Sequence, residues 1–435
     1  MSIIKIIELP REITYIGYAI FKGFNNIIQL DYLIQKFNNA KDEAVKIVKE
    51  YGGYKELVKK VTQEVNTKAG KRIFKITEIR KYEDYKLIDN KVLAGYLYQH
   101  IYNELPNMKY STTVFFEVLN AFKSINVLRD KLKLIGKYKL ANELPSDLEI
   151  EFNYWNFISC IGTKEKGRKG NRNIKVNPNG EVRINNPFGR DITGFVKFEG
   201  RFGRIFKQIY NDLISIDQLQ YYARVVRIFE NYNSEYVRCA IHVIIPFDIH
   251  VQYDCGKIVY PDVTQLLMSG QDVNADRVNS VIVNRKDLQI VNIRTFWFDE
   301  ANQKGVDSDY VWWRIEKELH ELFRWLKKNK CFLSIWEDYE LMGMWRFIIQ
   351  LKGEKLRSSE GNWRKFTFRS SIIEKAGVVA VREYYPLPIL HNPAGIDKLA
   401  KETCSYFGLD EHMMEAYYIA TLWHLEQEIN DKNHL

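Results

Sequence analysis

The stretch L-L-M-S-G-Q-D-V-N-A-D-R-V-N-S-V-I-V at 266–283 decides the fold. An apolar segment leads into a polar turn, and a second apolar segment follows, which predicts two strands joined by a hairpin. Asp272 stands in the first of these strands. A lone acidic residue at a strand end is usually a solvated cap or a turn former, so the weight of Asp272 depends on what accompanies it.

Two further acidic residues occupy comparable places later in the chain. Glu337 ends the apolar run C-F-L-S-I-W-E-D at 331–338, and Asp410 opens a predicted helix, G-L-D-E-H-M-M-E-A-Y-Y-I-A, at 408–420. Only a folded sheet could bring the three together. A carboxylate in the first strand, one at the end of a later strand and one on a C-terminal helix is the layout of RNase H-like nucleases.

Carboxylates in such a layout have a defined chemistry. Two divalent ions clamped between carboxylates about 4 Å apart can activate a water and stabilise the leaving oxygen of a phosphodiester. We therefore predict that Asp272, Glu337 and Asp410 are catalytic residues and ligands of Mg²⁺ or Mn²⁺.

The composition restricts the class of protein. The 435 residues, 46% hydrophobic and 27% charged, suit a soluble protein of two or three domains. The five cysteines are widely spaced and form no C-x-x-C pair, which argues against a disulfide scaffold and against bound zinc. The sequence has no G-x-x-x-x-G-K-[ST] loop, no G-x-S-x-G elbow and no H-E-x-x-H pair, so it does not predict an NTPase, a hydrolase of the elbow type or a zinc protease.

The positive charge is concentrated in one region. The net charge is +9, and residues 163–207 hold twelve Lys or Arg against four Asp or Glu. Glycine and aromatic residues are mixed with these basic side chains, which suits contact with phosphates and unpaired bases. The predicted nucleic-acid-binding residues are Lys164, Lys166, Arg168, Lys169, Arg172, Lys175, Arg201 and Arg204. The alternative is a flexible basic loop followed by a half-buried strand whose aromatics face the core.

Three zones follow one another along the chain. Residues 1–150 are predicted to be mostly helical, because apolar residues recur every three or four positions in 42–65 and 112–140. Residues 151–262 are predicted to be β-rich and basic, and residues 263–435 alternate strands with helices, which is typical of an α/β sheet with crossover helices. The predicted strands are 188–198, 237–249, 265–283, 288–298 and 331–336, and the predicted C-terminal helices are 308–329, 361–378 and 397–427.

No targeting or membrane segment is predicted. Lys5, Glu8, Arg11 and Glu12 interrupt any apolar run at the N-terminus, and no uncharged apolar stretch reaches the roughly 18 residues that span a bilayer. We expect a cytoplasmic protein of a prokaryotic cytosol or nucleoid, without a membrane partner.

The last zone resembles the RuvC-like nuclease domain of TnpB (OrfB) transposon proteins, which are relatives of type V CRISPR effectors. The similar pieces come in family order: D-V-N-A-D-R-V-N at 272–279, R-T-F-W-F at 294–298, S-I-W-E-D at 334–338, W-R-K-F-T-F-R-S-S-I-I-E-K-A-G at 363–377, I-L-H-N-P-A-G at 389–395 and G-L-D-E-H-M-M-E-A-Y-Y-I-A at 408–420. By order and type, the β-rich zone and the helical zone before it would correspond to the family's wedge-like and recognition domains.

This resemblance implies a guide-RNA-directed, divalent-metal-dependent DNA endonuclease, with a guide RNA and a double-stranded target DNA as partners. In such a protein base pairing reads the target, while the protein reads the shape of the heteroduplex and a short flanking motif. By position, Asp272 and Glu337 would be the ligands of the first and second motifs, and Asp410 the ligand of the third.

The identity of the third ligand stays open. Family members commonly have an aspartate where this chain has His412, so Glu411 and Glu415 are rivals of Asp410. Glu415 shares a helical face with His412, and H-M-M-E-A resembles the H-x-x-D-A pattern of RuvC resolvases.

Two departures from the family pattern bear on whether the chain retains nuclease activity. The chain lacks the paired C-x-x-C motifs of the family's zinc ribbon, and Asn274 stands where the first motif usually has a glycine. One alternative is a nuclease-inactive RNA-guided DNA-binding protein of the same ancestry. The other is a guide-independent, structure-specific RuvC-like nuclease.

Overall fold

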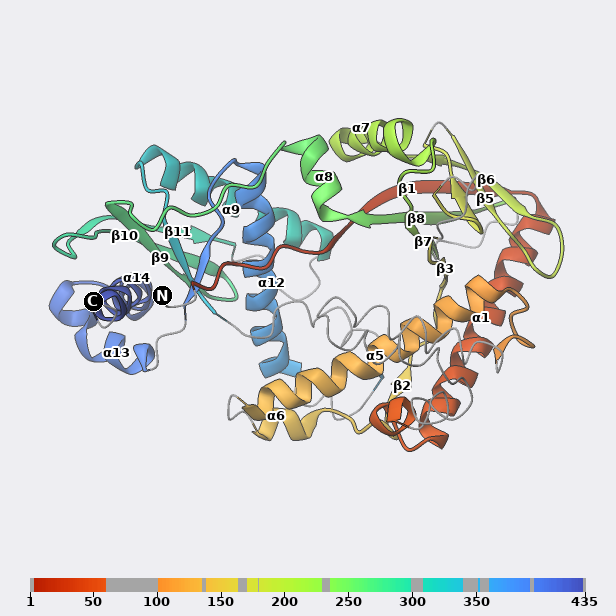
Figure 1. The fold of residues 1–435 in the computed structure, drawn as a ribbon, viewed down its shortest axis with the longest axis horizontal. Coiled ribbons are helices and arrows are strands. Elements are labelled where there is room, and N and C mark those ends of the chain that lie inside the picture. Colours follow the sequence, from red (N-terminus) through yellow and green to blue (C-terminus); the bar gives the residue numbers. More distant parts are fainter. Residues whose placement is uncertain are drawn as a thin grey trace, which may run out of the picture. The chain divides into compact units, whose positions relative to one another are not determined.

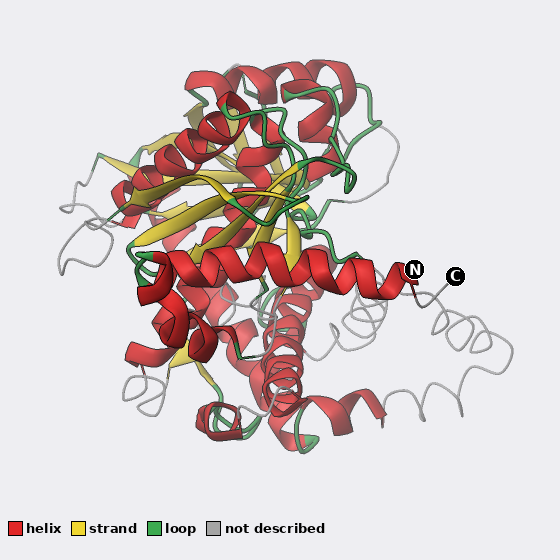
Figure 2. Ribbon diagram, turned by 90° about the vertical axis from the view of Figure 1, so that its left-hand side faces the viewer, coloured by secondary structure: helices red, strands yellow, loops and turns green. Residues whose placement is uncertain are grey.

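The computed structural model describes residues 4–59, 101–134, 138–162, 170–178, 180–228, 235–298, 308–338, 351–352, 360–391 and 395–432 (Figure 1). The chain divides into two compact units. Unit 1 comprises residues 1–11, 247–346 and 359–435, and unit 2 comprises residues 12–246 and 347–358. Both units combine helices with strands (Figure 2).

Unit 1 is built on a five-stranded sheet. Its strands are β9 (Leu267–Val273), β10 (Arg277–Asn284), β11 (Ile290–Trp297), β12 (Ser334–Glu337) and β14 (Ile389–His391). They lie in the order β11-β10-β9-β12-β14. β10 is antiparallel to β9 and β11, whereas β12 is parallel to β9 and β14. Three antiparallel strands, extended by two parallel strands beside the first of them, form the sheet of the RNase H-like fold that the sequence predicts.

Helix α14 covers one face of this sheet. The helices of unit 1 are α8 (Phe247–Asp254), α9 (Ser308–Lys328), α12 (Glu360–Arg382), α13 (Ile396–Phe407) and α14 (Glu411–Lys432). An apolar cluster that includes Met268, Ile335 and Ile419 joins α14 to the strands. The helix approaches so closely that β9 needs a glycine, because a Cβ at Gly270 would lie 1.8 Å from the carbonyl oxygen of Ala416.

Helix α9 packs on the opposite face. The ring centroid of Phe323 lies 6.1 Å from that of Trp336 on β12, and Trp325 lies 5.8 Å from Phe296 on β11. Trp336 precedes Glu337, and successive side chains of a strand point to opposite faces. Because Trp336 faces α9, Glu337 lies on the opposite face of the sheet, which α14 covers.

Unit 2 is built on a seven-stranded sheet with the order β3-β7-β8-β1-β6-β5-β4, in which all described neighbours are antiparallel. Its strands are β1 (Glu12–Lys22), β3 (Phe157–Cys160), β4 (Ile174–Val176), β5 (Glu181–Ile184), β6 (Ile192–Lys197), β7 (Tyr222–Arg227) and β8 (Tyr236–Pro246). Two further strands, β2 (Glu151–Phe152) and β13 (Leu351–Lys352), pair with each other.

The helices of unit 2 cover the buried face of that sheet and its β3 edge. They are α1 (Phe24–Glu50), α5 (Met108–Leu134), α6 (Tyr138–Glu143), α7 (Gly200–Ile209) and the π-helical turn η1 (Tyr210–Ile214). Tyr15 on β1 stacks with Phe206 of α7 at 5.3 Å, and Phe21 on the same face is fully buried. Helix α1 packs along α5. Among the described residues, no helix is long and apolar enough to cross a membrane.

The predicted elements of the last zone are present, with the helix predicted at 397–427 divided into α13 and α14. Several strands are not among those predicted, β1 and β14 among them. β1 lies inside the segment predicted to be mostly helical, although its residues alternate between buried and exposed from Tyr15 to Lys22. β14 is three residues long, too short for a periodic pattern. The strand predicted at 237–249 ends at Pro246, which has no N–H for a further ladder bond, and α8 begins at Phe247. The division into three zones stays a prediction.

Candidate metal centre

One polar residue from each strand of the five-stranded sheet lies in a single row. The row is Thr295 on β11, Asn279 on β10, Asp272 on β9, Glu337 on β12 and His391 on β14. The last paired residues of β9 and β12 are Gln271 and Trp336. Asp272 and Glu337 are the next residues on their strands, and they therefore lie side by side. Residues that pair in register point to the same face. That face is the one under α14, because Gly270 lies against the helix and precedes Asp272 by two residues.

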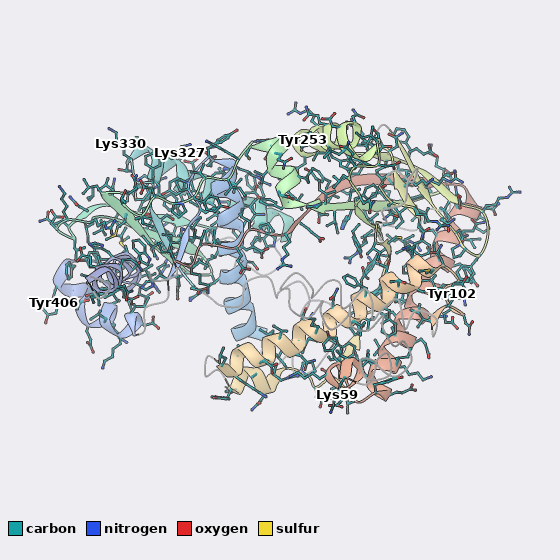
Figure 3. The ribbon with its side chains drawn as sticks, in the orientation of Figure 1. Lys59, Tyr102, Tyr253, Lys327, Lys330 and Tyr406 are labelled. Atoms are coloured by element: carbon teal, nitrogen blue, oxygen red, sulfur yellow. The ribbon has the colours of Figure 1, made fainter. Side chains whose placement is uncertain are left out.

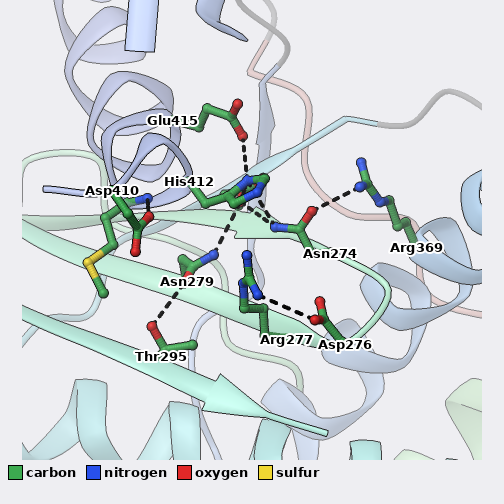
Figure 4. A network of polar contacts seen from close by, with 11 residues as sticks. Asn274, Asp276, Arg277, Asn279, Thr295, Arg369, Asp410, His412 and Glu415 are labelled. Atoms are coloured by element: carbon green, nitrogen blue, oxygen red, sulfur yellow. Dashed lines mark hydrogen bonds and ion pairs between the residues drawn. The ribbon is translucent and has the colours of Figure 1, made fainter. Parts of the chain in front are cut away.

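Asp272 is buried and held by amides. Only 2% of the residue is exposed. The side-chain N–H groups of Asn274 and Asn279 donate to its Oδ2 at 2.6 Å and 3.3 Å (Figure 4). The hydroxyl of Thr295 donates to Oδ1 of Asn279 at 2.9 Å. These bonds fix one carboxylate oxygen and satisfy part of the cost of burying a charge.

Arg369 fixes the orientation of the Asn274 amide. Its guanidinium, on α12, donates to Oδ1 of Asn274 at 2.8 Å. The amide oxygen must therefore face Arg369, and the NH₂ group must face Asp272. Asn274, which stands where the TnpB motif that the chain resembles usually has a glycine, thus connects the carboxylate of Asp272 to the guanidinium of Arg369 (Figure 4).

The first turn of α14 brings an imidazole and a second carboxylate to Asp272. Nδ1 of His412 lies 3.2 Å from Oδ2 of Asp272 and 3.2 Å from Oε2 of Glu415. His412 and Glu415 are three residues apart, so both side chains leave the helix on the face that meets the sheet. Glu415 is 9% exposed, whereas His412 is half-buried.

The electrostatics of this group follow from burial and pairing. Hydrogen bonds to Asp272 first, and then to Glu415, raise the pKa of His412 to about 10. Burial raises the pKa of Glu415; the hydrogen bond from His412 opposes this rise, and the charge of Asp272 adds to it. An imidazolium between two carboxylates provides the positive charge that such a buried pair needs.

Asp272, His412 and Glu415 fit a divalent cation. One ligand atom from each lies within 4.8 Å of the others, a grouping found among the described residues. Carboxylate oxygens suit Mg²⁺ and Mn²⁺, and the imidazole nitrogen favours Mn²⁺ of the two. A cation bound through Nδ1 must displace the proton on His412, so the charge that it brings replaces the charge of the imidazolium.

The structure places the three predicted ligands differently. Asp272 belongs to the cation-fitting group, and Glu337 stands beside it in register, half-buried and outside that group. Asp410 is exposed, and its Oδ1 accepts a hydrogen bond from the backbone N–H of Met413 at 2.8 Å, so it caps α14. Of its two rivals, Glu415 belongs to the group. The roles of Asp272, Glu337 and Asp410 as ligands stay predictions.

The predicted nucleic-acid-binding residues fall into two sets. Lys164, Lys166, Arg168 and Lys169 lie outside the described residues. Arg172 and Lys175, before and on β4, and Arg201 and Arg204, on α7, are all exposed. Their contact with nucleic acid stays a prediction.

Several residues of the site were not singled out from the sequence. Asn279 faces Asp272 across the hairpin, a pairing that follows once the polar turn between the two strands is placed. In the sequence, Asn274 stands where the TnpB motif that the chain resembles usually has a glycine, and nothing there indicates that it is a partner of Asp272. Arg369 comes from a helix far along the chain, and no sequence pattern connects it to β9.

Comparison with known proteins gives relatives without an assigned activity. No family model matches the chain. Two uncharacterized proteins of Aeropyrum pernix are 30% identical over 200 residues, which cover 43% of this chain and 50% and 44% of theirs. An uncharacterized protein of Saccharolobus solfataricus is 23% identical over 267 residues, 59% of this chain and 65% of that protein. The chain thus spans about half the length of the first two relatives.

Two solved structures are similar at low identity. The chain of a Cas12f1–sgRNA–target DNA complex matches with a TM-score of 0.36 at 12% identity, over 94% of this chain and 99% of that one. RuvC of T. thermophilus, in complex with a Holliday junction substrate, matches with a TM-score of 0.25 at 12% identity, over 36% of this chain and 91% of that one. The assignment of unit 1 to the RNase H-like fold rests on the order and directions of its five strands.

Proposed function

We propose that this chain is a divalent-metal-dependent DNA endonuclease of the RuvC-like type, directed by a guide RNA. One observation carries the nuclease part: the buried Asp272 lies 3.2 Å from His412, which bridges to Glu415, and Glu337 follows beside Asp272 in register. Carboxylates drawn from two strands and a helix, at one end of an RNase H-like sheet, suit hydrolysis of a phosphodiester.

Each residue has a distinct part in this proposal. Asp272 and Glu415 hold the cation, and Glu337 supplies a third carboxylate at the end of β12. A divalent cation held there supplies a nucleophile at neutral pH and stabilises charge on the phosphodiester. Asn274 orients Asp272, and the guanidinium of Arg369, bonded to Asn274, brings positive charge close to the site.

RNA guidance is the finer part of the proposal. It is supported by the ordered pieces that resemble TnpB within 263–435 and by the excess of Lys and Arg within 163–207. Base pairing would then select the DNA, and the basic surface would bind phosphates without reading the sequence.

The nuclease part is tested by cleavage of labelled double-stranded DNA, with protein purified together with its own RNA. In Mg²⁺ or Mn²⁺ the wild type cleaves. Asp272→Ala lowers the rate by more than about 100-fold, the largest loss usual for groups that only support a ligand. Binding of nucleic acid stays near the wild-type level, because the substitution leaves the basic surface intact. Wild-type cleavage by Asp272→Ala rules out this site.

The guidance part is tested by sequencing the RNA that co-purifies. One discrete, structured RNA supports guidance. The absence of any bound RNA from a protein that still cleaves DNA favours the guide-independent, structure-specific nuclease.

A second candidate function is favoured by the position of His412. Its Nδ1 lies 3.2 Å from a carboxylate oxygen of Asp272 and 3.2 Å from one of Glu415. A protonated His412 there neutralises the two carboxylates in place of a metal ion. The corresponding function is a nuclease-inactive RNA-guided DNA-binding protein. A wild type that binds RNA and DNA but cleaves in neither Mg²⁺ nor Mn²⁺ establishes this candidate in place of the first.

A further inference from the structure

The seven-stranded sheet of unit 2 has one open face. Along β1 the burial alternates strictly from Tyr15 onward, and along β8 every odd-numbered residue from Val237 to Ile245 is buried. The outward residues of an antiparallel sheet with one solvated face are normally polar. On this sheet several of them are large and apolar: Ile16 is 49% exposed, Tyr18 62% and Phe195 64%.

The strand register gathers these side chains on adjacent strands. Ile20 of β1 pairs with Phe195 of β6, and Tyr18 pairs with Lys197. Ile20 also pairs with Arg238 of β8 on its other side. Tyr18, Ile20 and Phe195 are thus one continuous apolar patch on two neighbouring strands, bordered by Arg238, and not single apolar residues scattered over the surface.

The backbone supports the ring of Phe195 from below. A Cβ at Gly180 would lie 2.4 Å from that ring, so the ring rests on the glycine backbone at the start of β5. The N–H of Val196 donates to the carbonyl of Gly180 at 2.9 Å and ties the two segments together. An aromatic ring held in place with its outer surface exposed is a platform on which a flat ligand can stack.

Basic residues surround this platform. The same face carries Lys22 on β1, Lys175 on β4, Arg183 on β5, Lys197 on β6 and Arg238 on β8. Its strands carry two acidic residues on this face, Glu181 on β5 and Glu12 at the far end of β1. Lys197 pairs with Glu199 and Arg183 pairs with Asp191, and both acidic partners are exposed or partly exposed. Ion pairs of this kind are worth little in water and exchange readily for a phosphate. The patch is therefore both apolar and cationic.

We infer that this face binds single-stranded RNA, with unpaired bases stacked on Tyr18 and Phe195 and phosphates against the surrounding Lys and Arg residues. Stacking requires exposed flat faces, which a duplex hides, and the charge fits a polyanion. The choice of RNA over DNA rests on the proposed guide RNA, and the hydroxyl group of Thr193 on the same face offers a partner for a 2′-OH.

The test measures binding without cleavage. Fluorescence anisotropy with a labelled, unstructured oligouridine of about 12 nucleotides, which covers one site of this kind, is recorded in EDTA on the RNA-stripped full chain carrying Asp272→Ala. Tyr18→Ala and Phe195→Ala are each expected to weaken binding by about tenfold, and the double variant by more, because each removes one stacking surface. Tyr18→Phe and Phe195→Tyr keep a ring and are expected to bind as the parent does.

The control is an exposed aromatic residue elsewhere. Tyr406, at the end of α13, is 86% exposed and projects from unit 1 (Figure 3), so Tyr406→Ala removes a comparable ring and should leave binding unchanged. The aromatic variants should keep the salt dependence of the parent, whereas Lys22→Ala with Lys197→Ala should lower the slope of log K against log salt by about 0.7 for each phosphate that is no longer neutralised.

Three outcomes overturn the inference. The first is a double Tyr18 and Phe195 alanine variant, folded by circular dichroism, that binds oligouridine as tightly as the parent. The second is equal or tighter binding of oligothymidine with the same losses, which assigns the face to single-stranded DNA. The third is a duplex RNA that binds through the same two rings. None of these outcomes depends on whether unit 1 cleaves DNA, so they leave the proposed function untouched.

Discussion

In the five-stranded sheet the functional candidates are buried carboxylates beneath α14, whereas in the seven-stranded sheet they are aromatic and basic side chains on an open face. Asp272 is 2% exposed and Phe195 is 64% exposed, although both stand in regular strands. A buried carboxylate needs hydrogen-bond or ionic partners, and these fix its position so that it can bind a cation. An apolar ring left in water is stabilised only when a ligand covers it. The buried carboxylates suit catalysis, and the exposed aromatic and basic side chains suit the binding of a ligand.

The largest expected effect is on the cleavage rate, and it distinguishes Glu415 from Asp410 at the start of α14. Glu415→Gln removes a charged ligand and is expected to lower cleavage by more than about 100-fold. Asp410→Asn is expected to keep both cleavage and stability, because Asn caps a helix about as well as Asp. Cleavage rates under Mn²⁺ for the two variants decide between them.

A matched variant shows whether Asp410 acts only as a cap. Asp410→Ala removes the acceptor of the Met413 N–H and should lower the free energy of unfolding by about 1 kcal/mol, with cleavage retained by the folded fraction. Loss of cleavage in Asp410→Asn at unchanged stability would instead restore Asp410 as the third ligand and remove Glu415.

The next effect tests how closely α14 must lie on the buried carboxylates. Gly270→Ala places a methyl group 1.8 Å from a backbone oxygen of the helix, so either the helix moves or the fold is strained. We expect a loss of at least about 1–3 kcal/mol in the free energy of unfolding by urea. Because the helix carries His412 and Glu415, cleavage should fall as well.

Gly377 provides the control for that substitution. A Cβ at Gly377, within α12, would lie 3.1 Å from Cδ1 of Ile7, the end of a flexible side chain that can shift. Alanine also favours a helix over glycine by about 1 kcal/mol. Gly377→Ala should therefore be neutral or stabilising, and equal losses in the two variants would mean that α14 is not in contact with β9 as described.

The smallest effect concerns the open sheet and pH. Burial, and then the charge of Arg224, lower the pKa of His242 on β8 from 6.5 to about 4. Between these two values the unfolded chain binds a proton that the folded chain does not, so stability should fall as the pH falls through this window. The expected loss is on the order of 1–3 kcal/mol by pH 4.

The variant His242→Gln separates the contribution of His242 to the pH dependence of stability from the contributions of other groups. Burial raises the pKa of Glu117, which faces Arg224, and this carboxyl group contributes in the opposite direction. His242→Gln should therefore lose less stability than the wild type between pH 7 and pH 4.5, measured by urea unfolding. Identical pH profiles would show that His242 is protonated as easily in the folded chain as in the unfolded one.

The sequence predicts four strands of the five-stranded sheet, all except β14, because the evidence for these four is local. The hairpin around Asp272 and the helix after Asp410 are each visible as an apolar pattern with a polar interruption. The choice among Asp410, Glu411 and Glu415 could not be made from the sequence, since all three lie within two turns of one helix. Only the packing of α14 on Gly270 decides which carboxylate faces Asp272.

The open face of the other sheet was harder to predict, for a different reason. Its central strand β1 lies near the N-terminus, while its neighbours β6 and β8 come far later in the chain. Tyr18 and Phe195 meet only through that long-range pairing, and an aromatic residue in a strand is more often part of a core. The basic residues of 163–207 indicated nucleic acid, but not the face on which these rings lie.

The central claim is that Asp272 and Glu415 hold a divalent cation, and direct binding of Mn²⁺ tests it without any need for guide or target. Free Mn²⁺ is followed by electron paramagnetic resonance during titration of the RNA-stripped protein at neutral pH. We expect the wild type to bind Mn²⁺, Asp272→Asn and Glu415→Gln to lose that binding, and Asp410→Asn to keep it. Binding by Asp272→Asn and Glu415→Gln with wild-type affinity would contradict the claim and place any cation elsewhere in the protein.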